Sequence, residues 1–368
     1  MRKFTDAEKA ILFLDGFREL EYKYKKAFLD EVGDGVADIL SSPNILSSFF
    51  EEIGNEKYAA TLSLACGENG FPEKLIAASL KHADDAVTLF SEDYPERLAN
   101  ISAPPLVLYC RGNTELLRSE NAVSIVGSRK MLSSYLVKTK EIAEEISSAG
   151  VTVVTGIAEG GDRAAIDGAL KSGNLISVLP GGLDCVYPAF HASLTDKIAE
   201  SGLVCSEYRA GTIPRNYMFP VRNRIIAGLG DGVLVTGGGE KSGVRHTAEF
   251  ALDYGREVWC LPYGLGVSSG RLPIDLVKNG AGIAESGEEI LFALGLEGKS
   301  GSSSFLPETT EEEDAVLALL AEGGSSLDRL IESSGIPVQD LLTTLGMLEL
   351  KGLCVKEGDG YRCLATGK

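Results

Sequence analysis

Six short apolar runs recur through the middle of the chain, and each is followed by glycine, serine or proline and then by apolar residues at helical spacing. Continuous runs of β-branched and aliphatic residues are typical of strands buried on both faces of a parallel sheet. Because these runs alternate with helical segments, the pattern predicts right-handed βαβ units and a doubly wound parallel sheet. The expected strands are Val123–Val126, Thr152–Thr155, Leu175–Leu179, Leu203–Ser206, Val233–Thr236 and Val258–Leu261.

The segments on either side of this core have helical patterns of their own. Before it, AEKAILFLDGF and KYKKAFLDEVGDGVADIL place apolar residues at helical spacing, and Pro104-Pro105 interrupts the chain before the apolar run Leu106–Tyr109. After it, EEDAVLALLAEG, SLDRLIESSG and PVQDLLTTLGMLELKG predict three helices, and alternation around Gly358-Asp359-Gly360 predicts a hairpin. Three helices and a hairpin form the pattern of a winged helix.

These patterns predict an α/β protein in four parts. A Rossmann-like doubly wound parallel sheet, with its lead-in segment, occupies residues 86–295. A small helical N-terminal domain of the SAM or helix-hairpin-helix kind occupies residues 1–85, and a winged-helix domain occupies residues 309–368. Residues 296–308 are rich in glycine and serine, which is the composition of a flexible linker.

Composition narrows the class of protein. The chain has 368 residues, a length that suggests about two or three domains. Hydrophobic residues make up 44% of it, which is enough to bury a sizeable core. No apolar run approaches the roughly 20 residues that span a bilayer, and the N-terminus has no signal-peptide pattern, so we expect a cytoplasmic protein. The seven cysteines stand singly without a CxxC pair, which predicts neither a zinc site nor a disulfide framework. Cys205 and Cys260 lie in apolar runs and are expected in the core.

A net charge of −18 is unfavourable for binding a nucleic acid, whose phosphates need Lys and Arg, but the distribution of the charge matters more than its sum. Residues 1–120 carry about −8 and residues 283–368 about −10, whereas residues 121–282 carry about 0. The acidity therefore belongs to the flanking segments, and a neutral core leaves room for a local basic groove.

Glycine-rich turns follow the expected strands, where ligands of open α/β sheets bind. Gly127-Ser128-Arg129 stands between a strand and a helix, an arrangement that points backbone N–H groups and an arginine at an anion. Gly156 and Gly160 could let the backbone approach a ligand closely, and Asp162 could cap the following helix. Tight turns with a solvated arginine explain the same residues equally well. The GxGxxG spacing is absent, so no nicotinamide or flavin cofactor is expected.

The densest basic cluster of the core lies at the start of another expected helix. Phe219 precedes Arg222, Asn223 and Arg224. Arginine side chains bind phosphates, and an aromatic ring can stack on a base. An amphipathic helix with exposed arginines is the alternative, but Arg222 and Arg224 lie two positions apart and cannot share one helical face. A later glycine-rich turn, Lys241-Ser242-Gly243, resembles a phosphate cradle, although the P-loop spacing is absent.

The sequence contains no catalytic constellation that we recognise. The HExxH motif is absent, and no GxSxG segment directly follows an expected strand as a nucleophile elbow does. The three histidines, His82, His191 and His246, lie beside no obvious nucleophile and acid. We therefore expect a binding protein rather than an enzyme.

The order of these motifs resembles that of the DprA family, also called Smf, the DNA-processing proteins of bacterial transformation. The family core runs IVGSR, SGxAxGID, GxGLDxxYP, SEYxxGxxP, FPxRNRIIAGL, SGSLxTA and GRxVFAVPG. The corresponding segments here are Ile125–Arg129, Thr155–Asp162, Pro180–Pro188, Ser206–Pro214, Phe219–Leu229, Ser242–Ala248 and Gly255–Gly264. The likeness extends over Tyr94–Leu364, and its FPxRNRIIAGL block is highly specific.

The resemblance implies a protein without catalytic activity or cofactor. Such proteins bind and protect single-stranded DNA and help to load the RecA recombinase during DNA uptake and homologous recombination, usually as homodimers. The family's phosphate-binding positions fall on the turn after the first strand and on the Phe219–Arg224 cluster. Together with the glycine-rich turns, the expected DNA-binding residues are Gly127, Ser128, Arg129, Gly156, Gly160, Phe219, Arg222, Asn223, Arg224, Lys241, Ser242 and Gly243.

The chain departs from the family pattern at several positions that we expect around the rim of the crevice. There they would affect DNA contacts more than the fold. The departing residues are Gly161, Ile166, His191, Thr236 and Ile274.

Two other functions stay open on the same fold: a nucleotide-processing enzyme resembling nucleoside monophosphate phosphoribohydrolases, and a small-nucleotide sensor. The Phe219–Arg224 cluster favours DNA, because a pocket for one nucleotide does not need it. The third helix of the winged-helix segment has almost no basic residue before Lys351, so we expect that domain to bind protein rather than read a major groove.

Overall fold

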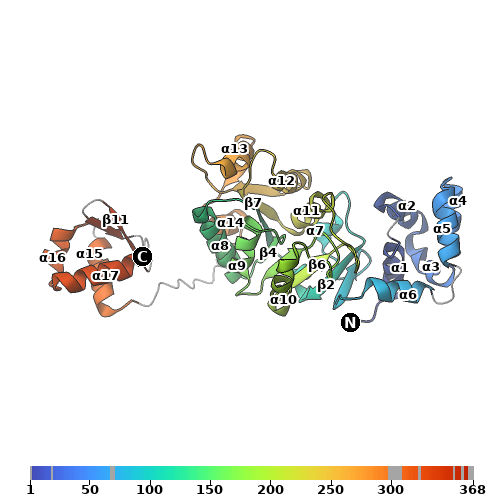
Figure 1. Cartoon of the computed structure of the whole chain (residues 1–368), viewed down its shortest axis with the longest axis horizontal. Coiled ribbons are helices and arrows are strands. Elements are labelled where there is room, and N and C mark those ends of the chain that lie inside the picture. Colours follow the sequence, from blue (N-terminus) through green and yellow to red (C-terminus); the bar gives the residue numbers. More distant parts are fainter. Residues whose placement is uncertain are drawn as a thin grey trace. The chain divides into compact units, whose positions relative to one another are not determined.

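A mostly parallel, nine-stranded sheet organises the larger part of the chain (Figure 1). Its strands follow the order β1-β2-β6-β5-β4-β3-β7-β8-β9, and the run from β6 to β9 pairs in parallel. All six predicted strands are present, as β3 to β8. The sequence did not predict β1, β2 or β9. Strands β1 and β2 add an antiparallel edge beside β6. The bounds are β1 Asp85–Thr88, β2 Val107–Gly112, β3 Ala122–Gly127, β4 Thr152–Thr155, β5 Leu175–Val178, β6 Leu203–Ser206, β7 Gly232–Gly237, β8 Glu257–Cys260 and β9 Gly282–Ile283.

The computed structural model describes residues 2–17, 20–66, 71–296, 309–321, 325–350, 353–357 and 360–363. The chain divides into two units, Met1–Gly301 and Ser302–Lys368. Apart from Leu296, the linker predicted at 296–308 lies outside the described residues.

Helices cover both faces of the sheet, as a doubly wound fold requires. Alternate residues of each strand point to opposite faces, so that Ile125 and Val153 join one hydrophobic cluster with α8, α9, α10 and α14, while Val126 and Val154 join another with α7, α11, α12 and α13. Cys205 and Cys260 are fully buried in the second cluster, which confirms their predicted place. The bounds are α7 Glu96–Ala99, α8 Ser133–Ser148, α9 Gly161–Ala169, α10 Ala192–Ser201, α11 Met218–Leu229, α12 Val244–Asp253, α13 Arg271–Lys278 and α14 Gly287–Ala293.

The direction of winding reverses between β3 and β7. From β3 the chain builds outward through β4, β5 and β6, then returns to place β7 on the other side of β3. The two strands stay paired to their ends, where the Ser128 N–H donates to the Gly237 carbonyl oxygen at 2.9 Å. Loops that leave such neighbouring strands in opposite directions open a crevice at the carboxyl edge of the sheet.

The N-terminal helices share a hydrophobic cluster with one face of the sheet, through Phe13, Phe28 and Phe50. The first helix begins at a capping box, in which Thr5 Oγ1 accepts from the Glu8 N–H at 3.2 Å and the Glu8 carboxylate accepts from the Thr5 N–H at 2.7 Å. At its other end, Tyr109 Oη of β2 donates to Asp15 Oδ2 at 2.8 Å. The bounds are α1 Asp6–Asp15, α2 Tyr22–Val32, α3 Asp38–Ser41, α4 Asn44–Glu52, α5 Glu56–Cys66 and α6 Phe71–Ser79.

The second unit is a winged helix, as predicted. Three helices pack on a small sheet of order β10-β12-β11, around a core that includes Val316, Leu330, Leu345 and Tyr361. The predicted hairpin strands are present, and its turn residues Gly358 and Asp359 lie outside the described residues. The bounds are α15 Glu311–Ala321, β10 Ser325–Ser326, α16 Leu327–Ser334, α17 Val338–Leu350, β11 Cys354–Glu357 and β12 Gly360–Cys363. Across the described residues, none of the helices has the length and apolar character that a membrane crossing requires.

Candidate functional site

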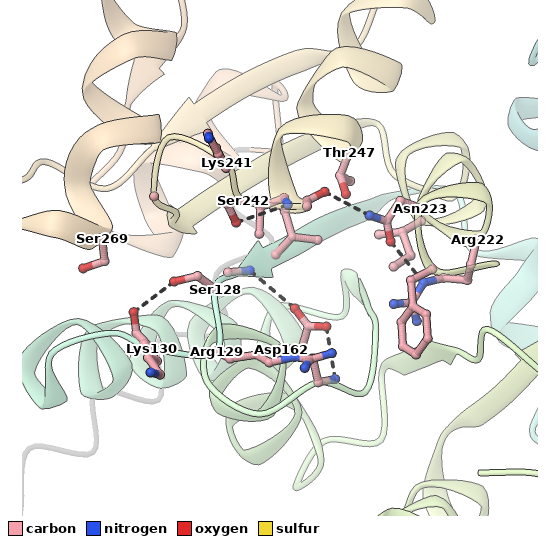
Figure 2. Close-up of a pocket in the computed structure, with 18 of the residues that line it drawn as sticks. Ser128, Arg129, Lys130, Asp162, Arg222, Asn223, Lys241, Ser242, Thr247 and Ser269 are labelled. Carbon is pink, nitrogen blue, oxygen red and sulfur yellow. Dashed lines mark hydrogen bonds between the residues drawn. The ribbon is translucent and has the colours of Figure 1, made fainter. Parts of the chain in front are cut away.

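A pocket of about 640 Å³ opens at the crevice between β3 and β7 (Figure 2). The turns after these two strands form two of its walls, the first turns of α11 form a third, and the turn between β4 and α9 contributes its floor. Its lining residues are Val126, Gly127, Ser128, Arg129, Lys130, Ala158, Asp162, Phe219, Arg222, Asn223, Ile226, Gly239, Lys241, Ser242, Gly243, Val244, Thr247, Ser268 and Ser269.

This pocket brings together most of the residues predicted from the sequence. Gly127, Ser128 and Arg129 meet the Phe219–Asn223 segment and the Lys241–Gly243 turn, although more than a hundred positions separate the first from the last. Gly156, Gly160 and Arg224, which were predicted with them, do not line it. The sequence analysis missed Lys130 and the pair Ser268-Ser269. Lys130 directly follows Arg129, and the serine pair lies in a glycine-rich loop after the sixth predicted strand, which was the available signal.

The glycines after β4 serve a contact between two turns. Gly160 has a φ of +85°, and a Cβ atom there would lie 2.2 Å from the Ser128 carbonyl oxygen. The Gly161 N–H donates to that same oxygen at 3.2 Å, and a Cβ on Gly161 would lie 2.4 Å from the Gly127 Cα. Glycine at both positions therefore lets the turn after β4 support the turn after β3 from below.

Asp162 fastens the same two turns together. Its carboxylate accepts from the Gly127 N–H at 3.4 Å and from the Ala158 N–H at 3.3 Å (Figure 2). The prediction that Asp162 caps a helix is wrong, because it lies inside the first turn of α9, whose N-cap is Gly160. Burial raises the pKa of the Asp162 carboxyl group, and the Arg222 guanidinium opposes that rise.

The basic cluster on α11 is more buried than its composition suggests. Arg222 is only 5% exposed; it donates to the Val178 carbonyl oxygen and, through Nε, to Asn223 Oδ1 at 3.1 Å. Asn223 Nδ2 in turn donates to the Gly243 carbonyl oxygen at 3.2 Å, which ties α11 to the turn after β7 (Figure 2). These bonds hold the Arg222 head group at the pocket wall and join α11 to the end of β5 and to the turn after β7.

Three cations on the rim are free of such bonds. Arg129, Lys130 and Lys241 are exposed, and none forms an ion pair with any residue that the structure describes. The Ser128 and Ser242 hydroxyl groups shape the same rim through local bonds: Ser128 Oγ donates to the Lys130 carbonyl oxygen at 3.0 Å, and Ser242 Oγ accepts from the Val244 N–H at 3.3 Å. Uncompensated positive charge around a concave surface attracts anions.

The departures from the family pattern lie outside the lining of this pocket. Ile166, His191 and Thr236 are instead buried, and Gly161 makes the close backbone approach described above. The expectation that they gather on the rim is therefore wrong. A threonine at 236 fits because Thr236 Oγ1 donates to the Val126 carbonyl oxygen at 3.2 Å between the paired ends of β3 and β7.

Comparisons with known proteins agree with this architecture. A sequence model described as DNA recombination-mediator protein A matches residues 85–295, and one for the DprA winged helix domain matches residues 303–360. Protein Smf from Escherichia coli is 35% identical over 308 residues, which cover 79% of this chain and 81% of the relative. Protein Smf from Synechocystis is 32% identical over 72% of this chain and 76% of its own length.

Two solved structures share the fold. DNA processing protein A from Streptococcus pneumoniae superposes with a TM-score of 0.64 at 26% identity, covering 79% of this chain and 98% of that one. The protein of the same name from Helicobacter pylori, whose structure describes a single-stranded DNA binding mode, gives 0.53 at 30% identity over 58% and 96% of the two chains. The resemblance seen in the sequence is thus confirmed, and the chain belongs to the DNA recombination-mediator protein A family, the family of the DprA and Smf proteins.

Proposed function

We propose that the pocket between β3 and β7 binds single-stranded DNA. On this proposal the protein acts without catalysis in the cytoplasm as a homodimer, protects the strand and helps to load the RecA recombinase. The observation that carries the proposal is the set of three exposed rim cations, Arg129, Lys130 and Lys241, beside the aromatic ring of Phe219 in one pocket.

Each part of the pocket suits a feature of an unpaired strand. The rim cations bind phosphates without regard to sequence. The Phe219 ring offers a face on which a base can stack. Every base has a π-face, and in an unpaired strand that face can reach the ring. The pocket therefore favours single strands over duplexes, in which neighbouring bases cover each other.

The relatives support the same class of ligand. The Helicobacter pylori protein, with which this chain shares its fold, is described as binding single-stranded DNA. The overall charge of −18 does not oppose the proposal, because salt screens charges that lie more than about 10 Å from the strand.

The test is fluorescence anisotropy of a labelled single-stranded oligonucleotide, with an unlabelled duplex as competitor, at low and at physiological salt. Tight binding that the duplex displaces poorly and that salt weakens is the expected result. Equal competition by duplex and single strand, or no binding at low salt, would contradict the proposal.

A further inference from the structure

An aromatic surface continues from the pocket onto the loop that follows β5. Tyr187 is 54% exposed and Phe190 is 67% exposed on this loop. The centroid of the Tyr187 ring lies 6.2 Å from that of Phe219, and the two rings are inclined at 80°. Since Phe219 also lines the pocket, Tyr187 lies beside the pocket whose rim carries the three cations.

Polar contacts and packing hold this loop in place. Gly182 N–H donates to the Thr212 carbonyl oxygen at 2.9 Å, and Asp184 Oδ1 accepts from the Gly211 N–H at 2.8 Å. Beneath the loop, His191 is 1% exposed, and its ring centroid lies 4.4 Å from that of Phe190. The His191 ring thus supports Phe190 from the protein side while most of the Phe190 ring stays open to solvent.

We propose that Tyr187 and Phe190 bind further nucleobases of the strand whose phosphates occupy the pocket. This inference rests on the proposed function and extends its site by a second stacking surface. Rings that project from a fixed loop lose little conformational freedom on binding, and a base gains stacking energy on any exposed aromatic face.

The neighbourhood of these rings favours a polyanion with planar groups as the occupant. Arg129, Lys130 and Lys241 lie on the rim of the pocket. Phe219 lines the same pocket, and its ring contacts that of Tyr187. Apolar aliphatic side chains would serve a protein partner equally well, whereas aromatic faces next to unpaired cations match the two chemical parts of an unpaired strand. Because the Tyr187 and Phe219 rings are nearly perpendicular, bases on them must separate from each other.

The first experiment compares oligothymidylates of about 4 and about 15 nucleotides by fluorescence anisotropy on the full chain. The double variant Y187A/F190A should lose roughly 5- to 100-fold in affinity for the longer strand. Its affinity for the shorter strand should fall much less, so that the ratio of the two affinities shrinks. The variant Y187F/F190Y keeps both rings and should keep the wild-type ratio.

Phe292→Ala is the matched control, because Phe292 is 68% exposed on α14 and does not line the pocket. It should leave both affinities unchanged. A wild-type ratio in Y187A/F190A overturns the inference and leaves the proposed function standing. A change of oligomeric state in Y187A/F190A, seen by sedimentation without loss of DNA affinity, would assign the surface to a protein partner and also overturns it. If the wild-type chain binds neither strand, both proposals fail.

A second experiment locates the bases directly. Irradiation of the complex with an oligonucleotide that carries 5-iodouracil crosslinks the base to an aromatic ring in contact with it, and peptide mass spectrometry identifies the residue. Crosslinks to Tyr187 or Phe190 in addition to Phe219 are expected. Crosslinks confined to Phe219 would overturn the second stacking surface.

Discussion

Arg222 and Arg224 lie two positions apart on α11, and their guanidinium groups serve opposite sides of the helix. Arg222 donates to the Val178 carbonyl oxygen beside the pocket, whereas Arg224 Nη2 donates to Glu207 Oε2 at 2.6 Å. Both residues are nearly buried, with exposures of 5% and 8%. The sequence argument that two such arginines cannot share a face is confirmed, and the structure places only Arg222 on the pocket.

Arg224→Ala should destabilise the fold rather than abolish DNA binding. Burial raises the pKa of the Glu207 carboxyl group and Arg224 opposes that rise, so removal of the arginine leaves a buried acid without its cation. Breaking such a pair costs about 3–5 kcal/mol of unfolding free energy, which urea denaturation measures. Arg224→Lys, which keeps the charge, should lose less. Intact stability with lost DNA affinity would instead give Arg224 a direct contact with the strand.

Gly160→Ala should damage the wall of the pocket through the backbone. A φ of +85° disfavours any side chain, and the new Cβ would lie 2.2 Å from the Ser128 carbonyl oxygen, so we expect a loss of at least about 1–3 kcal/mol. DNA affinity should fall as well, because the turn that carries Arg129 must move. Gly264→Ala is the control, since a Cβ there meets nothing within 4 Å. Equal melting temperatures for the two variants would contradict this account of Gly160.

His191 should make stability depend on pH. Burial lowers the pKa of its imidazole from 6.5, and Glu159 opposes this shift. Below about pH 6.5 the unfolded chain therefore takes up a proton that the folded chain does not, so the stability contributed by neutral His191 is present above that pH and is lost as the pH falls toward the folded pKa. Thermal melts of wild type and His191→Gln between pH 7.5 and pH 5.5 check this. The variant should lose less stability on acidification, and parallel curves would refute the role of His191.

The sheet was predictable because its strands are buried on both faces and read as continuous apolar runs. Val153 and Val154 illustrate this, since neighbouring residues enter opposite hydrophobic clusters. The two-residue strand β9, with Ile283 54% exposed, has no such signal. The winged helix was predictable from its three helical patterns and its paired strands.

The sequence predicted which turns meet at the candidate site better than it predicted what each residue in those turns contacts. Residues after β3 and β7 had to meet once the strand order was known, because both strands end at the same edge. Whether a glycine approaches a ligand or a neighbouring turn depends on tertiary packing, and Gly160 approaches the turn after β3. Asp162 likewise bonds to that turn instead of capping a helix. The burial of Arg222 likewise follows from its bond to Val178, which lies 44 positions away.

The salt dependence of DNA binding tests the central claim most directly. The variant R129A/K130A/K241A removes the exposed rim cations without disturbing the bonds of Arg222. The control K81A/K140A/K197A removes three exposed lysines outside the pocket and reaches the same net charge. Anisotropy titrations of a single-stranded oligonucleotide at several salt concentrations should show weaker binding in the rim variant, with a log–log slope flatter by about 0.7 for each lost phosphate contact. The control should keep the wild-type slope. Equal losses in both variants, or a wild-type slope in the rim variant, would contradict a DNA site in this pocket.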